Sequence, residues 1–428
     1  MRRRLLIAGA AASIAAAALS LGDALRGGSG QAAPPPAPDA SVTATQSTVA
    51  QLQGQLRANP RDAHAYALLG VAYEQRARET GDPSYYTKAE GVLHRALSLS
   101  PKDLVATSGL GSLALSRHRF RDALALGRKA LRLSPTTALT YGVVGDALVE
   151  LGRYPAAFRA FDTMASLKPG LASYSRVSYG RELLGNTVGA IDAMKLALHA
   201  ATSEREPRAW THWQLGKLYW SVGRLEAAEH EYRAALAVLP RYVYALDALA
   251  QVEAARGHTA QAISLERRAI GEVPLPQFAG LLGDLYRSRG KLVLARRQYA
   301  LVDVIQRLLV ANGVKTDLET ALFDVDHGIR LRHALVLARK AHEARPSIDG
   351  DDVLAWALAR TGRCSEALVW SKQALRLGTR DALKLFHRGM IERCLGHRAS
   401  AHRYLAGALA LNPYFSIVWS PVARKALR

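Results

Sequence analysis

One face of an expected helix carries the residues best suited to bind a partner, namely Trp210, Trp213, Lys217 and Trp220. Their spacing of i, i+3, i+7 and i+10 places them on one side of an α-helix. Aromatic rings with interspersed charge suit a groove for an extended peptide or a sugar polymer, because they bury area at a low entropic cost. The alternative is that two of these tryptophans pack between neighbouring helices.

Helices on either side are expected to bring further polar and aromatic side chains to the same groove, which we call the trough. These side chains are Arg176, Tyr179, Tyr244, Asp247 and Gln251. The mixture of rings and both charge signs favours a protein or peptide partner over RNA, whose groove would be basic and aromatic throughout.

Residues for catalysis or metal binding form no convincing set. The chain has no GxSxG, HExxH or P-loop motif, and its Gly-rich segment 109–114 has no preceding strand, as a dinucleotide fingerprint would require. One acidic group could be proposed as a divalent metal site, since carboxylates suit hard cations: Asp317, Glu319, Asp324, Asp326 and His327. We favour solvated acids that balance nearby arginines, and we predict no enzyme, metal or cofactor.

Only two cysteines occur, Cys364 and Cys394, which excludes a disulfide framework and a four-thiolate metal site. Stacked helices could bring the two thiols together. Whether they form a bridge or remain two thiols depends on geometry that spacing alone does not supply.

A formal charge of +21 implies attraction to anionic surfaces or polymers. Arginines recur at one place on several expected helices, and we interpret them as a solvated outer stripe: Arg128, Arg132, Arg233, Arg267, Arg268 and Arg297. Such a stripe leaves long-range attraction to a polyanion open.

The element that must position the trough is a pair of helices in residues 209–240. Its first half carries Leu215, Gly216 and Tyr219, its second half carries Ala228, Tyr232 and Ala235, and Pro240 ends it. Glycine beside a large residue lets two helix axes approach closely. Neither helix buries its apolar stripe alone, so such pairs must stack.

Prolines repeat the same unit along the chain. They stand at positions 60, 101, 135, 169, 240, 274, 346 and 413, so most intervals are near multiples of 34 residues. The first interval holds seven extra residues, which we expect as a longer turn within residues 77–86.

These residues resemble the tetratricopeptide repeat family, whose 34-residue helix-turn-helix unit has small residues, aromatics and a closing proline at such places. The resemblance covers nearly all of residues 50–413 and implies an all-α fold, a right-handed α-solenoid of about ten repeats. It also implies that the first helices line the concave face, where partners bind.

The N-terminal residues have the features of a targeting segment. Arg2, Arg3 and Arg4 precede an uncharged stretch, residues 5–22, whose modest hydrophobicity suits a signal peptide better than a secure anchor. We assign residues 1–32 to a signal peptide or membrane anchor, 33–48 to a Pro-rich linker, 49–412 to the solenoid and 413–428 to a capping helix.

The predicted protein is thus an exported, non-catalytic scaffold at the cell envelope, periplasmic, cell-surface or extracellular, or anchored through residues 5–22. The Ala- and Arg-rich composition suggests a bacterial source. The alternative is an envelope module that binds an anionic glycan or nucleic acid electrostatically. Sensitivity of binding to salt would distinguish the two functions.

Overall fold

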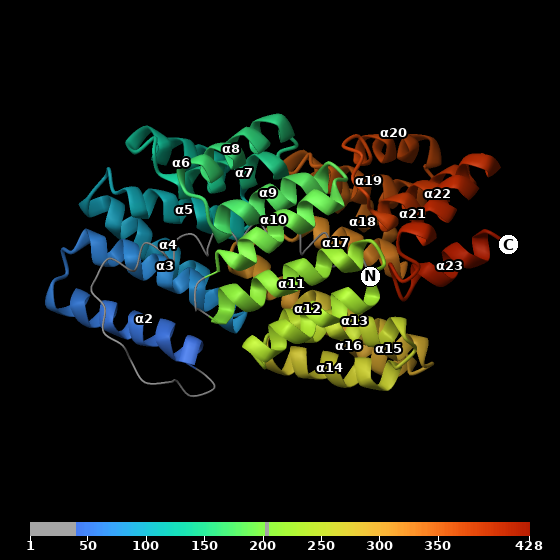
Figure 1. Ribbon diagram of the computed structural model, residues 1–428, viewed down its shortest axis with the longest axis horizontal. Coiled ribbons are helices and arrows are strands. Elements are labelled where there is room, and N and C mark those ends of the chain that lie inside the picture. Colours follow the sequence, from blue (N-terminus) through green and yellow to red (C-terminus); the bar gives the residue numbers. More distant parts are fainter. Residues whose placement is uncertain (1–39, 202–204) are drawn as a thin grey trace.

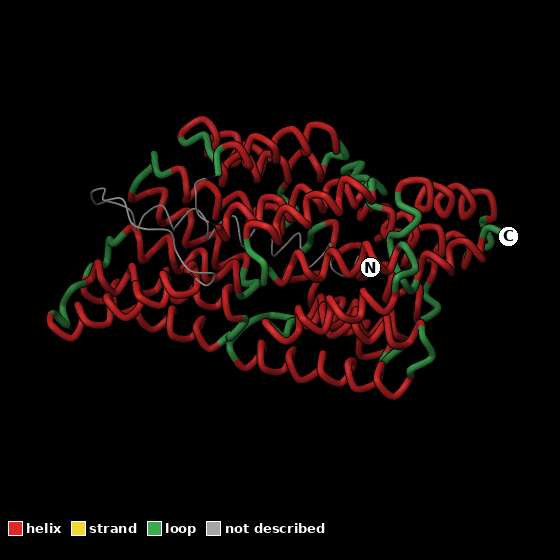
Figure 2. Tube along the Cα trace, turned by 60° about the horizontal axis from the view of Figure 1, so that its bottom comes forward, coloured by secondary structure: helices red, strands yellow, loops and turns green. Residues whose placement is uncertain are grey.

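The computed structural model describes residues 40–201 and 205–428, with side chains from residue 45 onward. The described residues form twenty-two helices and contain no strand (Figure 2). Twenty of these helices pair into ten antiparallel hairpins, so the predicted all-α solenoid of about ten repeats is confirmed. None of the described helices combines the length and the hydrophobicity needed to span a bilayer.

Hairpins one to five comprise α3 (Ala63–Thr80) with α4 (Ser84–Leu99), α5 (Leu104–Ser116) with α6 (Phe120–Leu133), α7 (Ala138–Glu150) with α8 (Tyr154–Leu167), α9 (Leu171–Leu183) with α10 (Thr187–His199), and α11 (Arg205–Ser221) with α12 (Leu225–Val238). Hairpins six to ten comprise α13 (Val243–Ala255) with α14 (Thr259–Glu272), α15 (Pro276–Ser288) with α16 (Leu292–Ala311), α17 (Asp317–His327) with α18 (Leu331–Ala344), α19 (Ile348–Arg360) with α20 (Cys364–Ala374), and α21 (Ala382–Cys394) with α22 (Arg398–Leu411).

Two single helices flank the hairpins. Helix α2 (Ala40–Ala58) packs on α3, and α23 (Trp419–Ala426) packs on α22. Helix α2 therefore begins inside residues 33–48, which the sequence assigned to a linker. The signal segment, residues 1–32, lies outside the described residues. In Figure 1 the chain winds from α2 near one end of the long axis to α23 near the other.

The expected longer turn in residues 77–86 is wrong. The turn between α3 and α4 spans only Gly81, Asp82 and Pro83, and the extra residues lengthen α3 to 18 residues and α4 to 16. Tyr85 and Tyr86 on the first turn of α4 pack on the cluster that includes Tyr73 of α3, so the insertion extends the hairpin and does not bulge outward.

Close helix packing follows the predicted pairing of a glycine with a large residue. A Cβ added to Gly216 would lie 2.4 Å from the ring of Tyr232, and one added to Gly145 would lie 2.4 Å from Phe161. Because no side chain intervenes, the two helices of each hairpin approach until the ring fills the space beside the glycine.

The first helices of the hairpins lie on the inside of the coil. Consecutive first helices such as α3 and α5, or α17 and α19, contact each other, whereas consecutive second helices make no comparable contact within the described residues. The arginines of the predicted outer stripe are all exposed on second helices, which confirms that prediction.

The coil is wound tightly enough for its second turn to dock on its first. Turns within hairpins one to five contact the loops that follow hairpins six to ten, at sequence separations of 192–197 residues. For example, Tyr154 Oη accepts a hydrogen bond from the Ile348 N–H at 2.7 Å, and Asn412 Nδ2 donates to the Trp220 carbonyl at 2.8 Å. We call this contact the seam.

Candidate functional site

The three tryptophans predicted for the trough are buried. Trp210, Trp213 and Trp220 are 2%, 5% and 3% exposed, and they pack in one hydrophobic cluster with Tyr232 and Leu249. Packing between hairpins, the alternative that the sequence left open, is therefore what the structure shows. Their role in partner binding stays a prediction.

Two other trough residues meet at this place and keep some exposure. Lys217 Nζ lies 4.7 Å from the centroid of the Trp213 ring, and the Tyr244 ring lies 5.1 Å from it. Both Lys217 and Tyr244 are only partly buried. The structure thus brings Trp213, Lys217 and Tyr244 together, and the last two offer the accessible atoms.

The remaining trough residues have internal partners. Arg176 donates to Asp146 in a buried ion pair at 2.8 Å between α9 and α7. Gln251 donates to Asp247 at 2.8 Å, one turn earlier on α13. The ring of Tyr179 packs against the cluster of hairpins two to four, away from Trp213. These side chains stabilise the array where they lie.

Further residues that the sequence interpretation missed surround Lys217 and Tyr244. Arg78 of α3 interacts electrostatically with Glu74, Glu206 and Tyr244, although α3 and α11 are far apart in sequence. The seam explains this proximity, since it lays hairpin one beside hairpins five and six. We call the group the inner cluster: Glu74, Arg78, Glu206, Trp210, Trp213, Gln214, Lys217, Tyr242 and Tyr244.

Desolvation dominates the electrostatics of the inner cluster. Burial raises the pKa of Glu74 from 4.5 to about 7, against a hydrogen bond from Ser112 Oγ and the charge of Arg78. Burial likewise raises the pKa of Glu206 to about 7 and lowers that of Lys217 to about 8. Glu206 and Lys217 each touch solvent, so protein surrounds them without covering them. Their charges are poorly compensated.

The inner cluster also contains buried polar atoms that have no hydrogen-bond partner among the described residues. These atoms are Glu74 Oε1, Arg78 Nη1, Trp210 Nε1, Gln214 Nε2 and Tyr242 Oη. Native proteins pair most buried polar atoms, so five unpaired atoms in one neighbourhood call for a ligand, a partner or water.

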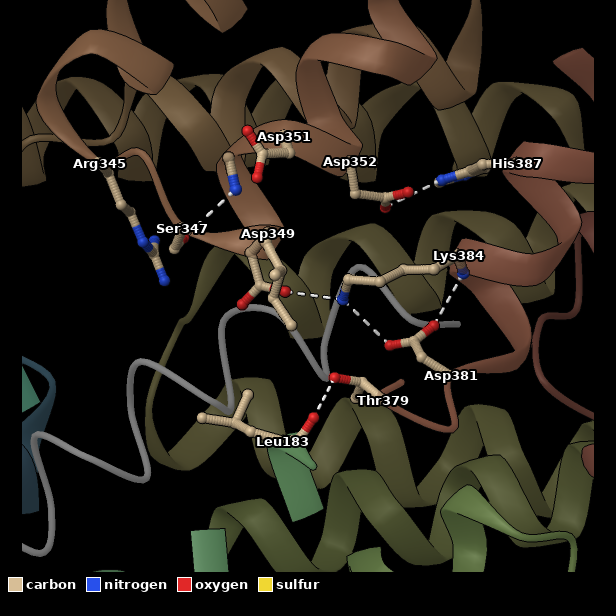
Figure 3. A network of polar contacts seen from close by, with 12 residues as sticks. Leu183, Arg345, Ser347, Asp349, Asp351, Asp352, Thr379, Asp381, Lys384 and His387 are labelled. Atoms are coloured by element: carbon tan, nitrogen blue, oxygen red, sulfur yellow. Dashed lines mark hydrogen bonds and ion pairs between the residues drawn. The ribbon is translucent and has the colours of Figure 1, made fainter. Parts of the chain in front are cut away.

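A second polar group, at the seam, pairs its charges internally (Figure 3), although Glu150 Oε1, Glu319 Oε2, Arg345 Nη2 and His387 Nε2 have no hydrogen-bond partner among the described residues. Lys384 Nζ lies 2.7 Å from Asp349 and 3.1 Å from Asp381, and His387 Nδ1 lies 3.0 Å from Asp352. We call this group the seam network: Lys384, Asp349, Asp381, Asp352 and His387, with Arg345 between Glu150 and Glu319. Opposite charges meet within it, so it is suited to joining hairpins.

The acidic group of hairpin eight separates into individual contacts. Asp317 pairs with Lys340, Glu319 with Arg345, and Asp324 with Arg330, while Asp326 accepts from Trp356 and His327 contacts Asp284. Among the described residues no group of three or more His, Cys, Asp or Glu side chains could hold a metal ion. Structural ion pairs account for these acids.

Cys364 and Cys394 form a disulfide, with their Cα atoms 6.2 Å apart. The bridge joins the start of α20 to the end of α21, and Cys394 is exposed. The sequence left open whether the two thiols form a bridge or remain free, and the structure shows the bridge.

Comparisons with known proteins identify the repeat. A family model described as tetratricopeptide repeat matches residues 211–240, which form most of hairpin five. None of the curated proteins compared with the chain matches it.

Several solved structures share the helical architecture. The chain is similar to the APC/C hetero-tetramer Cut9–Hcn1, at 14% identity over 91% of this chain and 94% of that chain, with a TM-score of 0.33. It is similar to the human IFIT1 dimer with m7Gppp-AAAA, at 14% identity over 78% and 77%, with a TM-score of 0.49. It is also similar to TTC0263, a thermophilic TPR protein of Thermus thermophilus, at 24% identity over 45% and 98%, with a TM-score of 0.39. A tetratricopeptide repeat in residues 211–240 and ten stacked helical hairpins are thus what the chain has in common with that family.

Proposed function

We propose that the protein is an exported, non-catalytic scaffold that binds an extended segment of a partner protein at the inner cluster. The tetratricopeptide-repeat fold supports a role in protein interaction. The inner cluster supplies both ring surfaces and hydrogen-bonding groups, which are the two components that peptide recognition uses.

The observation that carries the proposal is the set of unpaired buried atoms. Trp210 Nε1, Gln214 Nε2 and Arg78 Nη1 are donors, Glu74 Oε1 is an acceptor, and Tyr242 Oη can be either. These atoms have almost no exposed surface, so a peptide meets the partly exposed Glu206, Lys217 and Tyr244 first and reaches the unpaired atoms only after the side chains move. Filling them would also restore part of the solvation that Glu206 and Lys217 lack.

Export is supported by the disulfide between Cys364 and Cys394, because disulfides persist in oxidising compartments and are rare in the cytosol. The basic and apolar residues 1–32 would then direct secretion. N-terminal sequencing of the protein recovered from its native host tests this, with a mature start after Ala32 as the expected result. A cytosolic chain with free thiols would contradict it.

Site-specific photo-crosslinking tests the binding surface. A benzophenone amino acid placed at Tyr244, inside the coil, is expected to capture a partner in the native host. The same group at Arg267, exposed on α14, serves as the matched outer control. The variants Gln214→Leu and Glu206→Gln should reduce the yield at Tyr244 several-fold, because each removes a group that the partner would contact.

Equal capture from both positions would contradict an inner site. Capture only at Arg267, together with release at moderate ionic strength, would favour the alternative of an anionic polymer attracted to the outer arginines. Capture at Tyr244 that persists at elevated salt supports the proposed protein partner.

A further inference from the structure

The seam shows that this fold carries two edges that bind each other. The turn edge consists of the turns inside hairpins, and the loop edge consists of the loops between them. The turns of hairpins one to five dock on the loops after hairpins six to ten, so the turn of each hairpin meets the loop that follows the fifth hairpin after it.

Two docked turns leave no space for a side chain at their left-handed residue, whereas the docked turn of hairpin two carries left-handed His118, whose ring contacts the Lys315 carbonyl at 2.8 Å. A Cβ on Gly152 would lie 2.3 Å from the Pro346 carbonyl oxygen, and one on Gly185 would lie 2.4 Å from the Gly378 carbonyl oxygen. Backbone therefore meets backbone across the seam. Hydrogen bonds accompany this approach, including one from the Lys315 N–H to the Arg117 carbonyl at 3.1 Å.

Each edge also has a half that no other part of the described chain covers. The turn edge of hairpins six to ten is exposed at its left-handed glycines, and a Cβ on Gly257, Gly290, Gly362 or Gly396 would have nothing within 4 Å. The loop edge of hairpins one to three is exposed at Pro101, Pro135 and Pro169.

The free halves have the same local structure as the docked halves. In a docked turn the Arg153 N–H donates to the Leu148 carbonyl at 2.8 Å, and in a free turn the Lys291 N–H donates to the Tyr286 carbonyl at 2.9 Å. Docked loops contain Pro274, Pro346 and Pro413, and the free loops contain prolines at the corresponding places. Two surfaces that bind each other inside the chain therefore recur, unoccupied, on its outside.

We infer that the free turn edge of one molecule binds the free loop edge of a second copy of this chain, head to tail. The internal register fixes the contacts: the turn at Gly257 meets residues 100–103 of the second copy, and the turn at Gly290 meets residues 134–137. Because the two surfaces differ, each added copy leaves a new free edge, and the assembly grows as a linear filament.

Charge controls this association. The free turn edge carries exposed Arg289 and Lys291, and the free loop edge carries exposed Lys102 and Lys168. The seam offsets its cations with acids, as Glu150 does for Arg345, and the free edges have fewer of them. Like charges oppose docking between copies at low ionic strength, so added salt strengthens the association.

Sedimentation velocity of the full chain tests the inference over a range of concentration and salt. The wild-type protein is expected to show a weight-average mass that rises with concentration, more steeply at higher salt. A fourfold variant, Gly257→Asn, Gly290→Asn, Gly362→Asn and Gly396→Asn, is expected to remain monomeric. Asparagine tolerates the left-handed conformation, and its Cβ has room in the monomer but would clash in a turn that docks as those at Gly152 and Gly185 do.

The matched control is Gly91→Ala on α4, where an added Cβ also meets nothing but no edge is involved. It should associate as the wild type does. Circular dichroism melting confirms that the fourfold variant folds. A wild-type chain that stays monomeric up to about 1 mM at every salt concentration overturns the inference. Association that the fourfold variant retains overturns it equally.

Discussion

The inner cluster and the seam network both bury charged side chains on first helices, but they treat them differently. In the seam network Lys384 lies between two aspartates, whereas in the inner cluster the charge of Glu182 does not offset the burial of Lys217, whose pKa falls to about 8. Both groups contain buried polar atoms without a partner, but the charges of the seam network meet opposite charges and stabilise the coil. The inner cluster keeps partly exposed, poorly compensated charges at Glu206 and Lys217, which is why we place the binding function there.

The largest effect expected from this comparison is the loss of Lys384. The variant Lys384→Met removes the cation beside the buried carboxylate of Asp349, and breaking such a pair costs about 3–5 kcal/mol of the free energy of unfolding. Urea denaturation followed by circular dichroism measures it. A loss below about 1 kcal/mol would show that the seam network does not stabilise the coil.

Backbone contact at the seam is the next target. The variant Gly152→Ala should destabilise more than Gly362→Ala, by about 1–3 kcal/mol, because both residues are left-handed but only Gly152 faces a carbonyl oxygen across the seam. Parallel denaturation of the two variants gives the difference. Equal losses would mean that the seam opens in solution.

Protonation of Glu74 makes stability depend on pH. Its pKa is about 7 in the folded chain and about 4.5 in the unfolded chain, so the folded state binds more protons between these values. The free energy of unfolding should therefore fall as pH rises from 5 to 8, by about 1–2 kcal/mol for this group. The variant Glu74→Gln, which keeps an acceptor for Ser112, should show a shallower pH dependence. An unchanged slope would contradict the assignment.

The smallest effect is expected at Lys217. The variant Lys217→Met should change the free energy of unfolding by less than about 1 kcal/mol, since it removes a charge whose burial outweighs its attraction to Glu182. Its stability is best measured beside Lys384→Met under the same conditions. Similar losses for both lysines would remove the distinction between the two groups.

The fold could be read from the sequence because it repeats. Prolines near multiples of 34 residues, and glycines such as Gly216 opposite rings such as Tyr232, specify each hairpin locally. The pitch of the coil could not be predicted from these local repeats. It follows from small rotations accumulated over hairpins, and from contacts such as that between Tyr154 and Ile348, 194 residues apart.

The site was only partly predictable for the same reason. Helical periodicity correctly placed Trp213 and Lys217 together and located them beside Tyr244, but it could not show how deeply the tryptophans are buried. The residues that were missed had a signal in the sequence. Glu74 and Gln214 interrupt the apolar and small residues of their helices, and a polar residue at such a position indicates either a buried pair or a binding group.

The seam also bears on how fast a bound partner can leave. An extended segment held at the inner cluster would be enclosed by hairpins from two successive turns of the coil, so its escape would require sliding along the axis or separation of the turns. Dissociation would then be governed by the opening rate of the protein itself, and weakening the seam at Gly152 should shorten the lifetime of the complex even though Gly152 never touches the partner.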